Sequence, residues 1–460
     1  MTTLIQGGQV VSPSGALTAD VLVDGETIAA VGAPGTLAGD ETIDATGKYV
    51  LPGGIDAHTH MEMPFGGTHS VDTFETGTIA AAWGGTTTII DFAVQAKGTS
   101  LLSTLDKWHS KADGNCAIDY GFHMIMSDVN DSTLKEMRAC VDGGVGSFKM
   151  FMAYPGVFYS TDGEILRAMQ QAREIGATIM MHAENGIAID ELAAQAVAAG
   201  HTDPVQHGLT RPPELEGEAT SRAIRLAQVT GSPLYIVHLS ASQALAAVAE
   251  ARDNGQNVFA ETCPQYLYLS IEDLAKPDFE GAKFVASPPL REKSHQADLW
   301  RGLRTNDLSV VSTDHCPFCF KDQKELGRGD FRAIPNGMPG VEHRMDLLHQ
   351  GVVAGEISLG RWVETCSATP ARMFGLYPRK GVIAAGSDAD IVVYDPSAQQ
   401  TLSAETHHMN VDYSAYEGFS LTGKVHTVLS RGRVVVSPDG FHGSPGHGKF
   451  LSRELNQYLN

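Results

Sequence analysis

The segment Ala177-Thr178-Ile179-Met180-Met181-His182 decides the fold, because it is an apolar β-strand that ends in a metal-capable side chain. A predicted helix precedes it, since Thr161 and Glu164 have capping-box spacing and Gly176 ends the helical run. Strands that are continuously apolar are buried on both faces, as in parallel sheets whose connections are helices. Residues 161–182 therefore predict one helix–strand unit of an α/β protein.

The same unit recurs along the middle of the chain. Helices ending at Gly231 and Gly255 precede strands at 234–238 and 257–261, and a last copy ends in a strand at 308–314. Successive units of this kind are typical of a (β/α)8 barrel. We therefore expect an α/β fold with a TIM-like (β/α)8 barrel over residues 54–374.

Both ends of the chain follow a different pattern, in which short strands alternate with turns. Residues 21–28 predict a hairpin with Asp24 and Gly25 in its turn, and residues 389–394 predict a strand near the other end. We expect these ends, residues 1–53 plus 375–460, to pair into one small β-sandwich domain.

Composition excludes several classes of partner and location. The chain has 460 residues with 33 basic and 54 acidic side chains, a formal net charge of −21. This charge disfavours nucleic acid and anionic membranes, because phosphates are repelled. No apolar stretch approaches the roughly 20 residues that cross a bilayer, and no export signal is recognisable.

The six cysteines are sparse for this length, which predicts free thiols and a cytoplasmic location. Cys316 and Cys319 form the single CxxC pair. A zinc ribbon needs a second such pair, so ordinary packing or loop positions are favoured over a structural zinc site.

Metal-capable side chains stand at the ends of several predicted strands. His58 and His60 are two residues apart and therefore point to the same face, while His182, His238 and Asp314 end three further strands. The carboxyl ends of barrel strands converge on one face, so these side chains are expected to meet. Taken singly, each histidine is better explained by core packing, but the set predicts a site for Zn²⁺ or a neighbouring ion.

Lys149 lies inside an apolar run at 145–154, where an unpaired ammonium is unfavourable. One interpretation is a lysine whose head pairs with a carboxylate, and spacing alone favours it. The other is a neutral amine, with its pKa lowered by nearby dications, that adds CO₂. The resulting carbamate could bridge two metal ions.

Together these residues resemble the amidohydrolase superfamily, and more closely the dihydropyrimidinase/hydantoinase family. The likeness extends over nearly the whole chain, including its split terminal region. The segments that carry it are 54–60, 147–154, 181–184, 287–291, 312–317 and 334–340.

The resemblance implies a role for each candidate residue. Lys149 is expected to be an N6-carboxylysine that bridges two divalent ions, most favourably Zn²⁺, together with hydroxide. His58, His60 and Asp314 would hold the first ion, and His182 and His238 the second. Asp314 and Tyr154 would be catalytic, the first as proton acceptor and the second as donor to the developing oxyanion. Tyr154, Ser287 and Asn336 would bind the substrate.

By the same resemblance, the expected activity is hydrolysis of a cyclic amide. The substrates would be dihydropyrimidines (dihydrouracil, dihydrothymine), 5-substituted hydantoins or both, and the products N-carbamoyl amino acids. The partner is thus a small cyclic imide, and relatives are usually homotetramers. The alternatives are another cyclic-amide hydrolase, such as an allantoinase or dihydroorotase, and a non-catalytic scaffold homologue.

Three positions bear on these alternatives. Glu62 stands where dihydroorotases carry an arginine for the substrate carboxylate, which argues against that activity. All six ligand positions are present, which argues against the scaffold. Pro155 stands where many relatives have lysine, which leaves the substrate preference open.

A pocket for the ring substituent is a further hypothesis, with core packing as its alternative. The residues expected to form its walls are Met63, Phe65, Phe151, Phe158 and Tyr159.

Overall fold

The computed structural model describes residues 2–459. Within that range eight parallel strands form one sheet in the order β15-β14-β13-β12-β11-β10-β9-β6. The strands are β6 (Gly54–Thr59), β9 (Thr86–Val94), β10 (Asp119–Ile125), β11 (Ser147–Phe151), β12 (Thr178–His182), β13 (Leu234–Ile236), β14 (Val258–Thr262) and β15 (Val310–Val311). Nearly all of their residues are buried, as expected for strands that are covered on both faces.

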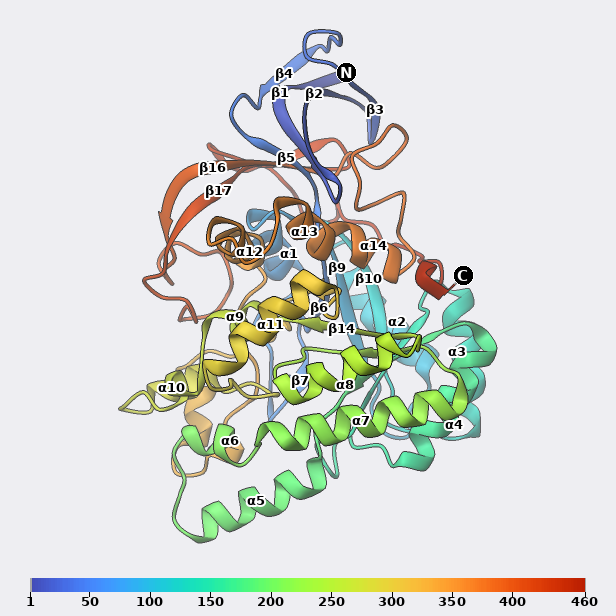
Figure 1. The fold of residues 1–460 in the computed structure, drawn as a ribbon, viewed down its shortest axis with the longest axis vertical. Helices are drawn as coiled ribbons and strands as arrows, with labels where there is room; N and C mark the ends of the chain where they lie inside the picture. The colour runs from blue at the N-terminus through green and yellow to red at the C-terminus, as the bar shows by residue number, and fades with distance from the viewer. Residues whose placement is uncertain (1, 460) are drawn as a thin grey trace.

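Helices cover the outside of this sheet (Figure 1). Those that follow or precede the barrel strands are α1 (Phe74–Trp83), α2 (Leu101–Ala112), α3 (Asp131–Asp142), α4 (Asp162–Ile175), α7 (Pro213–Thr230), α8 (Ser242–Asp253), α11 (Ser294–Thr305) and α12 (Arg344–Val353). Shorter or inserted helices are α5 (Gly186–Ala198), α6 (Val205–Leu209), α9 (Pro264–Tyr268), α10 (Ile271–Leu274), α13 (Leu359–Val363) and α14 (Thr369–Met373).

The sheet closes between its first and last strands. Thr59 bridges His315, whose carbonyl oxygen accepts a 2.9 Å hydrogen bond from the His60 amide. The buried Arg344 guanidinium donates to the carbonyl oxygens of Ile55 and Val311, both at 2.9 Å, and so joins β6 to β15. The predicted (β/α)8 barrel is confirmed.

The predicted helix–strand unit is present at α4 and β12. Thr161 is the N-cap of α4, and the Glu164 carboxylate accepts from the Thr161 amide at 2.7 Å, as in a capping box. Gly176 ends the helix with a left-handed φ of 73°.

Two predicted strands are shorter than expected. The segment predicted at 234–238 is extended only to Ile236, and the one at 308–314 only at 310–311. At the end of each predicted segment, His238 (φ 38°) and Asp314 (φ 53°) have left-handed backbone, which a strand cannot include.

The terminal strands pair into one mixed sheet of nine strands within residues 2–459, which fits the predicted β-sandwich. Its members are β1 (Thr2–Ser12), β2 (Gly15–Asp24), β3 (Thr27–Gly32), β4 (Glu41–Asp44), β5 (Tyr49–Pro52), β16 (Ile391–Thr401), β17 (Ser420–Ser430), β18 (Arg433–Ser437) and β19 (Gly440–Phe441). The predicted hairpin is β2–β3, with Asp24 opposite Thr27. Ile5, Val21, Ile391 and Leu429 share one buried cluster, so both chain ends contribute to its core.

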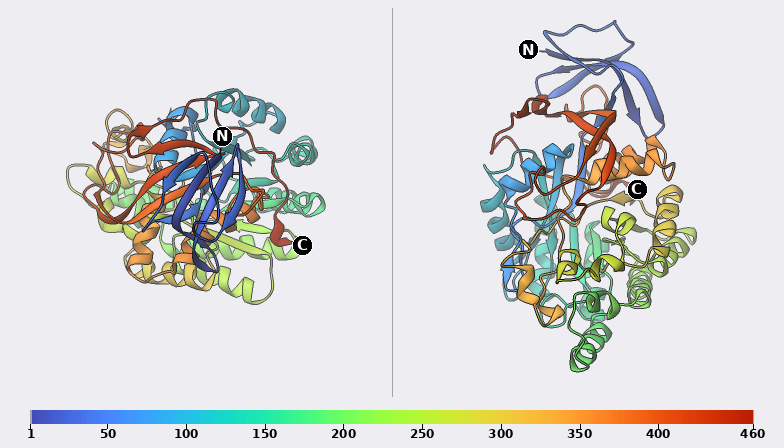
Figure 2. Two further views of the ribbon diagram at one scale, coloured as in Figure 1. Left: turned by 90° about the horizontal axis from the view of Figure 1, so that it is seen from above. Right: turned by 90° about the vertical axis from the view of Figure 1, so that its left-hand side faces the viewer.

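The terminal sheet lies beyond the amino ends of the barrel strands, since β5 leads into β6 through Gly53 (Figures 1 and 2). After β19 the chain returns to the barrel, where the Leu451 amide donates to the Tyr120 carbonyl oxygen at 2.7 Å. The opposite end of the barrel, near β7 (Pro64–Phe65), β8 (Thr68–His69) and α5, remains free for a site. None of the helices in residues 2–459 combines the length and apolar character needed to cross a membrane.

Candidate active site

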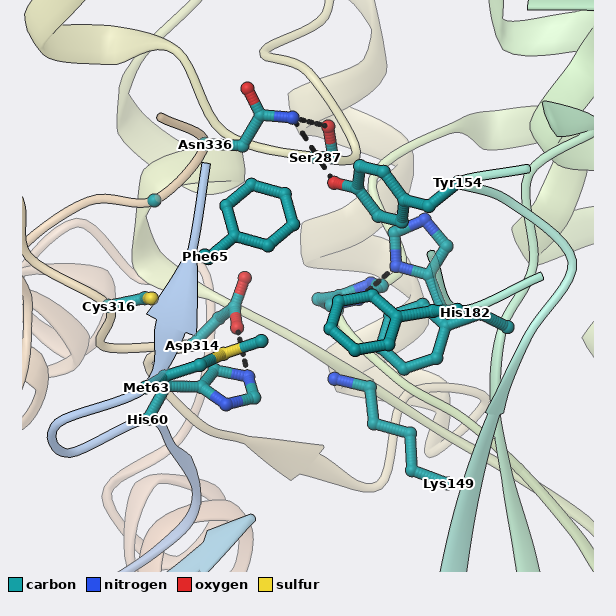
Figure 3. A pocket seen from close by; sticks show the side chains of 14 residues that line it. His60, Met63, Phe65, Lys149, Tyr154, His182, Ser287, Asp314, Cys316 and Asn336 are labelled. Carbon is teal, nitrogen blue, oxygen red and sulfur yellow. Dashed lines mark hydrogen bonds and ion pairs between the residues drawn. The ribbon is translucent and has the colours of Figure 1, made fainter. Parts of the chain in front are cut away.

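The side chains predicted from strand ends gather at the carboxyl end of the barrel (Figure 3). His58 belongs to β6, Lys149 to β11, and His182 is the last residue of β12. His238 and Asp314 follow β13 and β15 by two and three residues. The six residues from five strands are buried, Asp314 being the most exposed at 8%.

One half of the cluster centres on the Asp314 carboxylate. Its Oδ1 lies 3.0 Å from His58 Nε2 and 3.3 Å from His60 Nε2. Lys149 Nζ lies 2.9 Å from the same His58 nitrogen. This half therefore brings together the three predicted ligands of the first ion and the predicted bridging lysine.

The other half is a pair of imidazoles, in which His182 Nδ1 lies 2.9 Å from His238 Nε2. The two halves adjoin, because one ligand atom each of His58, His238 and Asp314 lies within 4.8 Å of the others. All six predicted ligand residues are therefore brought together in one place.

Backbone conformation helps to aim these side chains. His238, Asp314 and Tyr154 all have left-handed backbone, with φ of 38°, 53° and 60°. Such conformations are unfavourable for residues other than glycine and are held by the surrounding structure. Each of the three turns its side chain into the pocket at the point where regular structure ends.

Burial and neighbouring charges set the protonation of the cluster. Burial lowers the pKa of His60 to about 3, so its imidazole is neutral at physiological pH. Burial also lowers the pKa of Lys149 to about 8, which increases the fraction of neutral amine. Burial alone would raise the pKa of Asp314, but His58 and His60 beside it hold that pKa well below its ordinary value. Asp314 is therefore ionised.

These donors fit divalent metal ions of the first transition row. His58 lies between two carboxylates, with Nδ1 against Glu261 and Nε2 against Asp314 Oδ1; burial lowers the pKa of its imidazole, but these two anions raise it above the ordinary value. That Nε2 also lies 3.2 Å from His60 Nε2. The ligand atoms of this half therefore converge on one point, and a metal ion bound there would take the place of the His58 proton. Neutral imidazoles and a carboxylate are the ligands that zinc and its neighbours prefer.

Two carboxylates that orient the imidazoles were not predicted. Glu261 on β14 accepts from His58 Nδ1, from the His238 amide at 3.1 Å and from the Tyr235 hydroxyl at 2.9 Å. Glu184 accepts from His182 Nε2 at 2.8 Å. Such outer carboxylates fix the tautomer of metal-binding histidines. Glu261 stands at the end of the predicted strand 257–261, so the strand-end signal was present in the sequence.

Asp56 has a supporting role. Its carboxylate accepts hydrogen bonds from the backbone amides of His58 and Thr313, both at 3.2 Å, and from the Thr313 hydroxyl at 2.6 Å. It therefore joins the strand that carries His58 to the segment that carries Asp314.

The predicted substrate-binding residues meet across the pocket from the metal-capable cluster (Figure 3). Asn336 Nδ2 donates to the Tyr154 hydroxyl oxygen at 3.2 Å and to Ser287 Oγ at 3.1 Å. Burial raises the pKa of Tyr154 to about 12, so its hydroxyl keeps its proton and remains a hydrogen-bond donor.

Apolar side chains form another wall of the same pocket. Met63, Phe65, Phe151 and Phe158 line it, as expected, but Tyr159 does not. The backbone of Tyr159 instead bridges Phe151.

The two cysteines of the CxxC pair are both free thiols. Cys316 lines the pocket, and Cys319 lies outside it.

Comparison with known proteins identifies the class. Residues 49–435 match the amidohydrolase family. The chain is 67% identical over 462 residues to a D-hydantoinase of Streptomyces coelicolor, covering 99% of both sequences. Its structure matches the dihydropyrimidinase of Brevibacillus agri NCHU1002 with a TM-score of 0.98 at 52% identity, covering 99% of both chains. It matches the L-hydantoinase of Arthrobacter aurescens with a TM-score of 0.90 at 30% identity, covering 98% and 99%.

The chain therefore belongs to the amidohydrolase family. Within that family it is a member of the dihydropyrimidinase/hydantoinase group, as the sequence resemblance predicted.

Proposed function

We propose that this enzyme hydrolyses the ring amide of 5-substituted hydantoins and dihydropyrimidines and releases N-carbamoyl amino acids. The observation that carries the proposal is one pocket with three walls. The first wall is the metal-capable cluster. The second wall consists of the polar groups of Tyr154, Ser287 and Asn336, and the third consists of apolar side chains. The relatives named D-hydantoinase and dihydropyrimidinase support the same class of substrate.

We infer that two divalent ions, most favourably Zn²⁺, belong to this site. His58, His60 and Asp314 would hold one ion and His182 and His238 the other, with Lys149 carboxylated between them. When bound, such ions make water more acidic and polarise a carbonyl group. The position of Lys149 Nζ, 2.9 Å from His58 Nε2 in the middle of the cluster, supports its role as the bridge.

The chain's own groups supply proton transfer. Asp314 is ionised and faces the pocket, so it can accept the proton of the attacking water and pass it to the leaving ring nitrogen. Tyr154 is protonated and can donate to the carbonyl oxygen as negative charge develops there. Ser287 and Asn336 would contact the imide edge of the ring.

The apolar wall suits the substituent on the ring. Phe151 and Phe158 are stacked with centroids 5.0 Å apart, and Phe65 is parallel to Phe158 at 6.2 Å. Burial of an aliphatic or aromatic substituent against these rings is favourable. We propose preference for the D-enantiomer, in keeping with the name of the 67% identical relative and with the lower identity to the L-hydantoinase.

The test is metal analysis of the purified enzyme coupled to ring-opening assays. The panel contains dihydrouracil, D- and L-enantiomers of a 5-substituted hydantoin, dihydroorotate and allantoin. We expect about two divalent ions per chain and turnover of dihydrouracil and the D-hydantoin. Preferred turnover of allantoin or dihydroorotate would replace the proposal with one of those activities, and a metal-free, inactive protein would favour the scaffold.

The assembly and location are proposed on less direct grounds. We propose a homotetramer, as in relatives of the family, and a cytoplasmic location, in keeping with six free cysteines. Light scattering of the purified protein measures the first, and fractionation of the source cells the second.

A further inference from the structure

Lys324 is a fully buried lysine that lies outside the metal-capable cluster. It begins η2 (Lys324–Gly327) and has 0% exposure. Its Nζ donates to three backbone carbonyl oxygens: Val285 at 2.8 Å, Pro335 at 2.7 Å and Gly337 at 2.7 Å. An ammonium has three N–H donors, so all three are used.

Among the described residues, no carboxylate pairs with this lysine. Its nearest aromatic neighbour is Phe318, whose ring centroid lies 5.8 Å from Nζ. Burial therefore lowers the pKa of Lys324 to about 7. A buried cation without an anion is unfavourable, so a lysine here carries a cost that an apolar residue of similar length would not.

The three carbonyl groups belong to two loops. Pro335 and Gly337 flank Asn336, and Val285 lies two residues before Ser287. The Gly337 amide also donates to the Val285 carbonyl oxygen at 3.0 Å. The lysine thus joins the loop of Ser287 to the loop of Asn336 directly behind the polar wall of the pocket.

We propose that Lys324 is a positioning residue, which sets the spacing of the two loops so that Ser287 and Asn336 fit the imide edge of the ring. This inference rests on the proposed function, because the imide edge is part of the proposed substrate. Asn336 donates to Ser287 Oγ and to the Tyr154 hydroxyl oxygen, so a shift of its loop would disturb the whole polar wall. Within residues 2–459, the Lys324 ammonium makes no hydrogen bond or ion pair with the metal-capable residues.

The test compares Lys324→Met, which keeps the length of the side chain but has no donor, with the wild-type enzyme. We expect KM to rise about tenfold for both substrates and kcat to change about threefold at most. Metal content should stay at the wild-type level. Lys324→Gln keeps two N–H donors and should give an intermediate KM, and it serves as the test if Lys324→Met does not fold.

Lys380→Met is the matched control. Lys380 is equally buried but pairs with Asp119, Asp388 and Asp390, where the barrel meets the terminal sheet. Its replacement should lower stability and leave KM unchanged. Wild-type KM in the Lys324 variants, or a loss of kcat and metal with KM unaltered, would overturn the positioning role alone. A wild-type enzyme that opens neither ring would instead overturn the proposed function on which it rests.

Discussion

Two regions of this molecule are rich in histidine and carboxylate, but they differ in how their polar atoms are arranged. The first is the cluster at the carboxyl end of the barrel. The second, which we call the α12 cluster, surrounds a cavity of about 180 Å³ between α12 and the terminal sheet. Its members are Glu342, His343, Asp346, His407 and His408.

In the α12 cluster the polar groups do not converge on one point: two of the histidines pair with separate partners, whereas His343 Nε2 and Asp346 Oδ1 have no hydrogen-bond partner in the part of the chain that the structure describes. His408 Nδ1 donates to Glu342 Oε1 at 2.8 Å, and its ring stacks on Trp83 at 4.1 Å. His407 pairs with the Tyr413 carbonyl oxygen. In residues 2–459, only His58, His238 and Asp314 bring three ligand atoms within 4.8 Å of one another.

The comparison teaches that convergence of ligand atoms on one point, and not the number of histidines, marks a metal centre. A closed parallel barrel directs side chains from different strands to one point. A helix terminus packed against a sheet brings such residues close together in space without directing their ligand atoms to one point.

The largest expected effect tests the centre of the barrel cluster. Lys149→Ala removes the proposed bridge, so we expect loss of bound metal and a fall in kcat of about 10³-fold or more. Short carboxylic acids should restore part of both, because they can replace the carbamate. Metal analysis with a ring-opening assay measures this, and full activity of the untreated variant would refute the bridging role.

The second prediction compares the two clusters through one glutamate in each. Glu261→Gln weakens the acceptor of His58 Nδ1, so metal affinity should fall about 10- to 100-fold. Glu342→Gln changes the partner of His408 and should leave metal affinity unchanged. Competition with a chelating dye measures both variants, and equal losses would remove the distinction between the clusters.

The third prediction concerns the apolar wall. Phe158→Ala opens the pocket beside the ring substituent, so kcat/KM for a 5-phenyl-substituted hydantoin should fall about tenfold. The value for unsubstituted hydantoin should change little, because that ring does not reach the wall. An unaltered preference between the two substrates would assign Phe158 to core packing.

The smallest expected effect lies in the α12 cluster. Burial raises the pKa of Asp346 to about 7, above its value of about 3.9 in an unfolded chain. The folded state therefore favours the protonated acid, and stability decreases as pH rises from about 4 to 7. Asp346→Asn resembles the neutral acid, so its Tm should exceed that of the wild type by about 2–4 °C at pH 8 and by less at pH 5. Calorimetry at the two pH values tests this prediction. A Tm of the variant that lies below the wild-type Tm by the same amount at both pH values would contradict it.

Several features of the site could be predicted from the sequence because they depend on short-range patterns. The pattern of apolar strands ending in His58, His182, His238 and Asp314 was enough to predict the barrel and where these residues meet. Glu261 shared that signal but was not selected. The lengths of two strands were wrong, because left-handed backbone at His238 and Asp314 is set by tertiary contacts.

Lys324 shows where such prediction ends. Its partners are backbone carbonyl groups at 285, 335 and 337, and a carbonyl group is present at every residue, so no sequence pattern marks them. The position of Tyr159 could not be predicted either, because it depends on the path of a loop whose backbone pairs with Phe151.

The sequence by itself determined the repeating helix–strand units, the positions of the metal-capable side chains and the family. Only the tertiary structure decided which donors face one another, which carboxylates accept from the imidazoles and which lysine joins the loops of Ser287 and Asn336. The reason is that periodicity and capping act within a few residues, whereas hydrogen bonds between distant segments exist only once the barrel has closed.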